Sequence, residues 1–160
     1  MRFSDFELHP AIHRGIADLG FTEPTPIQRD AIAPAVAGRD VLACAMTGSG
    51  KTAAFVLPIL QRMAGSRGGR TRALVLTPTR ELASQIHEHI EALARHTPVK
   101  AATVFGGVKA GKQEQALRAG VDIIVATPGR LLDHMQHSYA RFEQLEFLVL
   151  DEADRMLDMG

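Results

Sequence analysis

One short stretch has the residue types and the spacing needed to hold a phosphate group. Gly48, Ser49 and Gly50 are small, so successive backbone N–H groups can wrap an anion where a strand gives way to a helix. Lys51 would reach the β and γ phosphates, and the Thr52 hydroxyl would ligate Mg²⁺. The alternative is a glycine-rich turn without a ligand. The predicted phosphate loop comprises Ala45, Met46, Thr47, Gly48, Ser49, Gly50, Lys51 and Thr52.

A second stretch competes for the same role. From Gly106 the pattern Gly-x4-Gly-Lys-Ser/Thr is met as far as Gly111 and Lys112, but Gln113 takes the last position. An amide is a poor substitute for the hydroxyl that ligates Mg²⁺. The first stretch departs from the pattern only at Ala45, which opens the turn and where a methyl group can be tolerated. We therefore assign phosphate binding to residues 45–52.

Two acidic residues near residue 150 are the expected partners of this loop. Asp151 and Glu152 directly follow an apolar run, the arrangement that holds magnesium at the end of a strand. Asp151 would bind the metal, partly through water, and Glu152 would orient or deprotonate the attacking water. Together with Lys51 and Thr52 they form the predicted catalytic set. The alternative is that both acids begin a solvated loop.

Apolar runs and helical segments alternate along the chain, and they indicate how these residues are positioned. The runs are continuous, as expected of strands covered on both faces. They lie at residues 41–44, 73–76, 101–104, 123–126 and 147–150. Helical segments lie at residues 51–63, 80–95, 109–118 and 128–136, and two more helices precede the first strand. The alternation predicts an α/β fold with a mainly parallel sheet flanked by helices.

Polar or glycine-rich clusters follow every predicted strand. The carboxyl ends of parallel strands share one edge of a sheet, and open α/β proteins bind their ligands there. We therefore expect one functional surface at this edge. The clusters lie at residues 45–52, 77–81, 105–107, 127–130 and 151–154.

These clusters resemble the motifs of DEAD-box RNA helicases, in order and over nearly the whole chain. Residues 151–154 spell the Asp-Glu-Ala-Asp signature, and residues 45–52 look like motif I, whose usual first residue is alanine. The other similar segments are residues 20–28 (Q motif), 78–82 (motif Ia), 106–107 (paired glycines) and 127–130 (motif Ib), with Phe3 at the place of an isolated upstream aromatic. The short amino terminus and residues 156–160 are similar to bacterial members.

The resemblance implies a RecA-like P-loop NTPase fold, with ATP and Mg²⁺ as cofactors. Gln28 would read the amino edge of adenine and Phe3 would pack against the base, while Phe21 of the Q motif is counted among the ATP-binding residues. For Gln28 the alternative is a capping box with Thr25 at the start of a helix that has Pro26 in its first turn. The two roles are not exclusive.

The resemblance also implies an RNA-binding surface after the second to fourth strands. Arg80 and Arg130 would pair with phosphates, and the paired glycines allow close approach of the sugar–phosphate chain, which implies little sequence preference. The alternatives are surface salt bridges for the arginines and helix caps for Thr79 and Thr127. The implied RNA-binding residues are Pro78, Thr79, Arg80, Gly106, Gly107, Thr127, Pro128, Gly129 and Arg130.

Composition restricts the remaining possibilities. Eighteen Lys and Arg residues balance eighteen Asp and Glu residues, so RNA must be held by a few placed groups and not by bulk charge. No stretch is apolar enough to span a membrane. The single cysteine, Cys44, fits a reducing cytoplasm, where we expect a monomer, and its place in an apolar run predicts burial. His87, His89, His134 and His137 are expected on solvated helix faces.

Residues 1–160 are expected to form a first RecA-like domain, with Q-motif helices in residues 1–38 and the P-loop core in residues 39–160. In the family, a Ser-Ala-Thr strand between those of motifs I and II and a second RecA-like domain should follow. The domain is therefore expected to be incomplete at its C-terminus, and residues 1–160 alone poorly stable and nearly inactive. The leading hypothesis is an ATP-dependent RNA helicase. The alternatives are a non-enzymatic, ATP-regulated RNA-binding module and another P-loop ATPase such as a DNA translocase.

Overall fold

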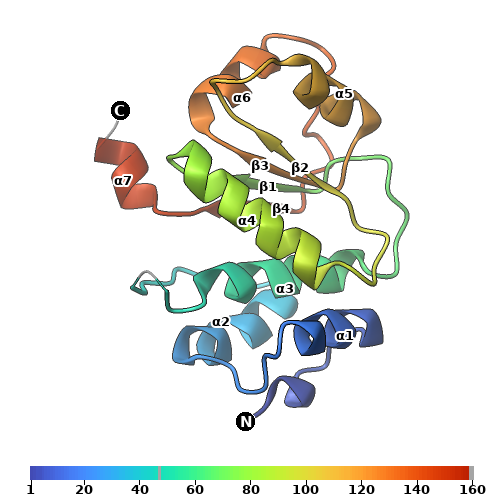
Figure 1. Ribbon diagram of the computed structural model, residues 1–160, viewed down its shortest axis with the longest axis vertical. Coiled ribbons are helices and arrows are strands. Elements are labelled where there is room, and N and C mark those ends of the chain that lie inside the picture. Colours follow the sequence, from blue (N-terminus) through green and yellow to red (C-terminus); the bar gives the residue numbers. More distant parts are fainter. Residues whose placement is uncertain (47, 159–160) are drawn as a thin grey trace. The chain divides into compact units, whose positions relative to one another are not determined.

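The computed structural model describes residues 1–46 and 48–158 (Figure 1). The chain divides into two compact units. The helical unit comprises Met1–Arg67 and His89–Pro98, and the sheet unit comprises Gly68–Glu88 and Val99–Gly160. Each unit is described separately below.

The sheet unit is built on four parallel strands in the order β2-β3-β1-β4. Every strand is followed by a helix, as parallel connections require. The strands are β1 (Ala73–Leu76), β2 (Ala101–Val104), β3 (Ile123–Ala126) and β4 (Phe147–Leu150). The helices are α4 (Arg80–Leu93), α5 (Gly111–Ala119), α6 (Pro128–Met135) and α7 (Ala153–Asp158). The end of α4, from His89, belongs to the helical unit. The predicted α/β class with a parallel sheet and flanking helices is confirmed.

The register of the sheet brings the polar clusters to one edge. Leu76 pairs with Ala126 on one side and with Leu150 on the other, so the strands end level with each other. Backbone hydrogen bonds continue past the strand ends, from Thr77 N to the Ala126 carbonyl and from Asp151 N to the Leu76 carbonyl. The residues that follow β1, β3 and β4 therefore start from a shared edge, as predicted.

The core of the sheet unit lies between the sheet and two helices. Alternate side chains of the strands, including Leu74 and Ile124, pack with Leu117 of α5 and Leu131 of α6. In Figure 1 these two helices lie on one side of the sheet and α4 lies on the other. This two-sided cover explains why the runs in β1 and β3 are continuously apolar.

A buried ion pair ties the amino ends of three strands together. Arg72 Nη2 donates to Asp122 Oδ1 at 3.1 Å, and both side chains are almost fully buried. The other carboxylate oxygen of Asp122 accepts from Lys100 N at 2.9 Å. A buried charge is tolerated when it is paired and hydrogen-bonded in this way. These residues precede β1, β3 and β2, so the pair fixes the end of the sheet opposite the predicted functional edge.

The helical unit packs short helices around an apolar centre. The elements are the 3₁₀ turn η1 (Phe3–Asp5) and the helices α1 (Pro10–Asp18), α2 (Pro26–Val36) and α3 (Lys51–Met63). Ile12, Ile32 and Leu57 are fully buried, one from each helix. Gly15 of α1 lies so close to the end of α4 that a Cβ there would collide with the Leu93 carbonyl. Among the described residues, no helix is long and apolar enough to cross a membrane.

The prediction of a strand at residues 41–44 is wrong. These residues have no regular secondary structure, and Leu42 is 96% exposed. Cys44 is exposed as well, so its predicted burial is also wrong. A strand is stabilised by hydrogen bonds to a neighbouring strand, and no such pairing forms for this segment within the described residues. An apolar run can form a strand only where a neighbouring strand is present to pair with it, and the sequence pattern does not show whether one is.

The prediction that β4 is covered on both faces is also wrong. Its residues alternate between partly buried and exposed, with Leu148 60% and Leu150 53% exposed. In the described part of the chain β4 pairs only with β1, so its other edge has no strand beside it. The continuous apolar run of β4 is therefore not matched by continuous cover.

Candidate functional site

The phosphate loop lies in the helical unit and has the backbone that anion binding requires. Gly48 and Gly50 adopt left-handed φ values of 81° and 86°, which favour glycine. The α3 helix starts at Lys51, and no side chain caps it. The Ser49 hydroxyl is buried and has no hydrogen-bond partner among the described residues. An uncapped helix start beside a spare hydroxyl suits a phosphate group, which accepts several hydrogen bonds at once.

The remaining residues of the predicted loop frame this turn. Ala45 and Met46 are irregular, and Met46 is exposed, while Thr52 lies in the first turn of α3. Thr47 lies outside the described residues. Nothing within 4 Å would meet a Cβ added at Gly48. There is consequently open space beside the Gly48 backbone, of the kind a phosphate needs.

Gln28 links the start of α2 to this loop. Its Oε1 accepts from Thr25 N at 2.9 Å, so it caps the helix as the capping-box pattern predicts. Its Nε2 donates to the Gly50 carbonyl at 3.1 Å, a contact that the sequence did not indicate. The packing is close, because a Cβ on Gly50 would collide with the Gln28 amide. Adenine recognition by Gln28 stays a prediction.

Phe3 and Phe21 lie together in the helical unit. Their rings are stacked with centroids 6.1 Å apart, and Phe3 also packs on Phe6. Phe3 is buried, so most of its ring already has partners. The two aromatics line a hollow of about 600 Å³ together with Ile16 and His13. Packing of Phe3 against a base stays a prediction.

The predicted acids lie at the end of β4 in the sheet unit. Asp151 Oδ2 accepts from the Thr77 hydroxyl at 3.5 Å, and Thr77 is fully buried at the end of β1. Glu152 is the one non-glycine residue with positive φ, 53°, in the described part of the chain. Backbone strain of this kind is commonly kept at functional sites. Glu152 also pairs with Arg155 at 3.4 Å on the surface.

Oxygen ligands suit Mg²⁺, and the predicted metal ligands provide them. Thr52 supplies a hydroxyl and Asp151 a carboxylate, and both are the hard oxygen donors that this ion takes. Thr52 belongs to the helical unit and Asp151 to the sheet unit, so the structure describes each ligand in its own surroundings. No group of three or more His, Cys, Asp or Glu residues is arranged for a metal among the described residues.

The predicted RNA-binding residues after β1 and β2 are brought together by an aromatic ring. Arg80, at the start of α4, is exposed and places its guanidinium 5.4 Å from the centre of the Phe105 ring. Gly107 has a φ of 83°, and a Cβ there would meet Arg80 Nη1. Arg80 therefore makes a cation–π contact in place of the alternative salt bridge. The sequence reasoning missed Phe105, although its position beside the paired glycines was a signal.

Thr79 and Thr127, the two threonines of the predicted RNA surface, differ in whether they cap a helix. Thr79 Oγ1 accepts from Leu82 N at 3.2 Å, so the capping alternative is confirmed for Thr79. Thr127 occupies the N-cap position of α6, yet its side chain makes no capping hydrogen bond. The capping alternative is therefore not confirmed for Thr127. Of the remaining residues, Pro78 is buried, Gly106 is exposed with open space at its Cα, and Pro128 and Gly129 form the first turn of α6.

A chain of side-chain hydrogen bonds holds Arg130. Arg130 Nη1 donates to the Val108 carbonyl at 3.0 Å and to Gln113 Oε1 at 3.3 Å, and no carboxylate pairs with it in the described residues. Gln113 is only 6% exposed, and its Nε2 donates to the Phe105 carbonyl at 2.9 Å. Arg130 therefore contacts the glycine loop and not a surface acid. Gln113, whose amide argued against a phosphate loop at residues 106–113, therefore has a structural role of its own.

His134 completes this chain, and the expectation of a solvated imidazole is wrong for it. His134 is 3% exposed and lies 3.0 Å from Gln113 Oε1 through Nε2 and 2.6 Å from the Tyr139 hydroxyl through Nδ1. Burial lowers the pKa of His134, and the Arg130 charge lowers it further. The helical spacing had placed His134 on the outside, but residues 136–140 turn back and cover it with Tyr139.

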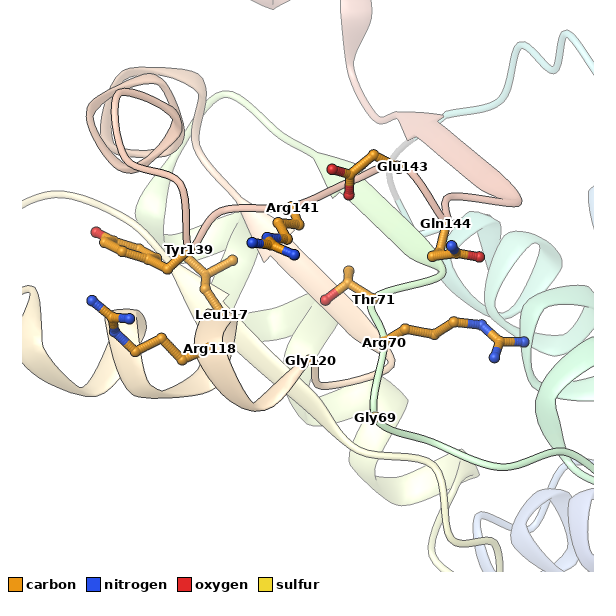
Figure 2. A pocket seen from close by; sticks show the side chains of 10 residues that line it. All are labelled: Gly69, Arg70, Thr71, Leu117, Arg118, Gly120, Tyr139, Arg141, Glu143 and Gln144. Atoms are coloured by element: carbon orange, nitrogen blue, oxygen red, sulfur yellow. The ribbon is translucent and has the colours of Figure 1, made fainter.

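One hollow of the sheet unit lies away from the predicted edge. Figure 2 shows it between Thr71, Gly120 and Gln144, which precede β1, β3 and β4. It measures about 450 Å³ and includes Arg70, Arg118, Tyr139, Arg141 and Glu143 among its lining side chains. The hollow therefore lies at the amino ends of the strands, and the predicted residues lie at the carboxyl ends.

Known proteins resemble this chain along its whole length. The family model for the DEAD/DEAH box helicases matches residues 25–160. The ATP-dependent RNA helicase SrmB of Escherichia coli is 48% identical over 161 residues, which cover 99% of this chain and 36% of that protein. The ATP-dependent RNA helicase DRS1 of Chaetomium globosum is 50% identical, over 99% of this chain and 20% of that protein. The DEAD-box ATP-dependent RNA helicase 28 of Oryza sativa subsp. japonica is 47% identical, over 99% of this chain and 20% of that protein.

The chain thus spans about a third of the length of the first relative and about a fifth of the other two. The family match covers the phosphate loop, the acidic signature and the segments between them. It agrees with the resemblance inferred from the motifs and with the observed α/β fold. The chain belongs to the DEAD/DEAH box helicase family.

Proposed function

We propose that the chain is the ATP-binding part of an RNA helicase that couples ATP binding and hydrolysis to local separation of RNA strands. The observation that carries the proposal is the phosphate loop, with its two left-handed glycines, an uncapped helix start and a buried serine hydroxyl without a partner among the described residues. Relatives named ATP-dependent RNA helicases support the substrate and the nucleotide. The single cysteine supports a reducing cytoplasm, and we propose a monomer.

In this proposal the phosphate loop and the acidic signature divide the chemistry of hydrolysis. Lys51 neutralises the β and γ phosphates, and Thr52 and Asp151 hold Mg²⁺, partly through water. A bound Mg²⁺ ion supplies charge neutralisation at the transferring phosphate. Glu152 orients the attacking water or takes its proton, and the Thr77 hydroxyl fixes one oxygen of Asp151 for its task.

The RNA half of the proposal uses the glycine loop and the starts of α4 and α6. Arg80 and Arg130 supply positive charge, and the exposed Gly106 lets the sugar–phosphate chain approach the backbone. The predicted contacts are all to sugar and phosphate, so binding depends little on sequence. Selection of RNA over DNA would come from contacts to the 2′-hydroxyl.

The nucleotide half is tested with Lys51→Ala in the protein as its gene encodes it. We expect ATP turnover stimulated by single-stranded RNA to disappear, because the charge on the β and γ phosphates is lost, while RNA binding without ATP is retained. Lys112→Ala is the matched control, since it removes the lysine of the competing glycine stretch and should leave turnover unchanged. Turnover that survives Lys51→Ala contradicts the assignment, and loss of both activities indicates misfolding.

The RNA half is tested by the salt dependence of RNA binding. A single-strand contact to about three phosphates gives a log–log slope of affinity against salt of about −2. Fluorescence anisotropy with a labelled oligouridylate at several salt concentrations measures this slope. Arg80→Met should make it shallower, since one charged contact is lost. A slope near zero in the unmodified protein would remove the electrostatic contacts assigned to Arg80 and Arg130.

A further inference from the structure

Gln113 joins two parts of the predicted RNA surface that are not adjacent in the sequence. Its Nε2 donates to the carbonyl of Phe105, just before the paired glycines. Its Oε1 accepts from Arg130, in the first turn of α6, and Arg130 in turn donates to the Val108 carbonyl just after the glycines. A buried carboxamide thus holds both the glycine loop and the guanidinium that lies beside it.

The direction of each hydrogen bond in this chain is fixed by chemistry. The Phe105 carbonyl only accepts, so the amide nitrogen of Gln113 faces it and the amide oxygen faces Arg130 and His134. His134 Nε2 must then carry the proton, and Nδ1 accepts from the Tyr139 hydroxyl. The neutral imidazole that this requires agrees with the lowered pKa of His134. The amide of Gln113 and both ring nitrogens of His134 therefore each have a compatible partner.

The remaining N–H groups of Arg130 point to what this arrangement is for. An arginine has five N–H donors, and only Nη1 is used in the contacts to Val108 and Gln113. Within the part of the chain that the structure describes, the Nε and Nη2 donors make no hydrogen bond and can pair with an anion. A guanidinium already held by two acceptors loses less conformational freedom when it pairs with a phosphate. Loss of one acceptor would free the side chain and the loop together.

We propose that Gln113 is a positioning residue for RNA: it holds Arg130 and the glycine loop of residues 105–108 in the arrangement that receives a phosphate of the strand. The inference rests on the proposed RNA-binding function of this surface. Gln113 itself lies buried beneath the surface and does not touch the RNA. Its effect on affinity passes through Arg130 and through the Phe105 carbonyl.

The test uses Gln113→Met, which keeps the length of the side chain and removes both hydrogen-bonding groups. In the protein as its gene encodes it, we expect the dissociation constant for a labelled oligouridylate to rise about tenfold at fixed salt, in line with loss of a hydrogen bond to a charged group. ATP affinity should stay close to that of the unmodified protein, while the thermal midpoint should fall by a few degrees because the buried partners of Gln113 lose a hydrogen bond. Gln115→Met is the matched control, because Gln115 is exposed two residues away on the same helix.

The double variant Gln113→Met with Arg130→Met separates positioning from independent action. Because part of the effect of Gln113 passes through Arg130, the double variant should bind RNA more weakly than Arg130→Met alone but less weakly than the product of the two single losses predicts. His134→Gln keeps a donor amide near Gln113 and should bind RNA more tightly than His134→Leu. This rescue is not expected if the network only fills space.

Three outcomes would overturn the inference. One is a folded Gln113→Met protein that binds RNA as well as the unmodified protein. Another is a double variant whose loss of RNA affinity equals the product of the losses in the two single variants. The third is joint loss of ATP and RNA binding, which would make Gln113 a structural residue. If the unmodified protein does not bind RNA, the proposed function fails first, so the two failures are distinguishable.

Discussion

Gly48 and Gly50 share a left-handed backbone but differ in what surrounds them. A Cβ at Gly48 meets open space, whereas a Cβ at Gly50 runs into the amide of Gln28. The close approach at Gly50 exists because Gln28 donates to the Gly50 carbonyl and so draws the loop against α2. The turn is therefore held from outside by a side chain as well as by its own backbone preferences.

We predict that Gly50→Ala is more harmful than Gly48→Ala. Both variants force an alanine into the left-handed region, at about 1–2 kcal/mol. Only Gly50→Ala also displaces Gln28, which adds about 0.5–1.5 kcal/mol for the lost hydrogen bond. Urea unfolding at equilibrium measures the difference. Equal losses in the two variants would show that the contact between Gln28 and Gly50 contributes nothing to stability.

Local spacing predicted some contacts of single residues and could not predict others. The bond from Thr25 N to Gln28 and the cap of Thr79 on Leu82 both join positions three apart, so a helix-start pattern reveals them. The contacts of Gln28 with Gly50 and of Gln113 with Arg130 span 22 and 17 positions. Those contacts depend on how helices and strands pack, which a pattern of spacing does not contain.

Helices were predicted more reliably than strands, for a physical reason. A helix makes its hydrogen bonds within its own segment, so residues 51–63 form α3 with the predicted bounds. A strand makes its hydrogen bonds with another segment, so the apolar run at residues 41–44 forms none in the described chain while residues 73–76 lie between two neighbours. The motifs after the strands were still found, because they depend on sequence position and not on pairing.

The α6 helix carries a buried imidazole, and this makes stability depend on pH. Burial and the Arg130 charge lower the pKa of His134 from its ordinary 6.5, while Glu114 and Asp133 oppose the shift. Above this ordinary value the imidazole is neutral in both folded and unfolded protein. As the pH falls below it, the unfolded chain takes up a proton before the folded chain does, so stability is lost until the lowered pKa is reached.

We therefore predict that the free energy of unfolding falls as the pH drops below 6.5, the ordinary pKa of histidine, and falls less in His134→Gln. Urea unfolding at a series of pH values gives the two curves. His89→Gln is the matched control, because it makes the same substitution at an exposed position. A His134→Gln curve parallel to that of the unmodified protein would contradict the prediction.

The sheet has helices on both sides (Figure 1), and β4 is one of its two edge strands in the described chain. Next to β1, the strand β4 has no second neighbour in the described chain, and Leu148 and Leu150 are more than half exposed. The open edge of β4 agrees with the expectation, drawn from the family resemblance, that a further strand pairs beside it, which stays a prediction. Unpaired apolar strands are a common cause of association between chains.

We predict that residues 1–160, produced alone, self-associate through β4 and that Leu148→Lys reduces this association. A lysine on an exposed edge strand adds charge where another strand would pair. Because the Leu148 side chain is 60% exposed, its replacement should lower the free energy of unfolding only slightly. Sedimentation over a series of concentrations measures the association. Leu74→Lys is the control: Leu74 pairs with Leu148 in the register but is buried, so that change should unfold the sheet unit. Two outcomes would contradict the prediction: residues 1–160 stay monomeric at every concentration, or the Leu148→Lys variant is as unstable as Leu74→Lys. Either result would show that the β4 edge is protected in a way the strand order does not reveal.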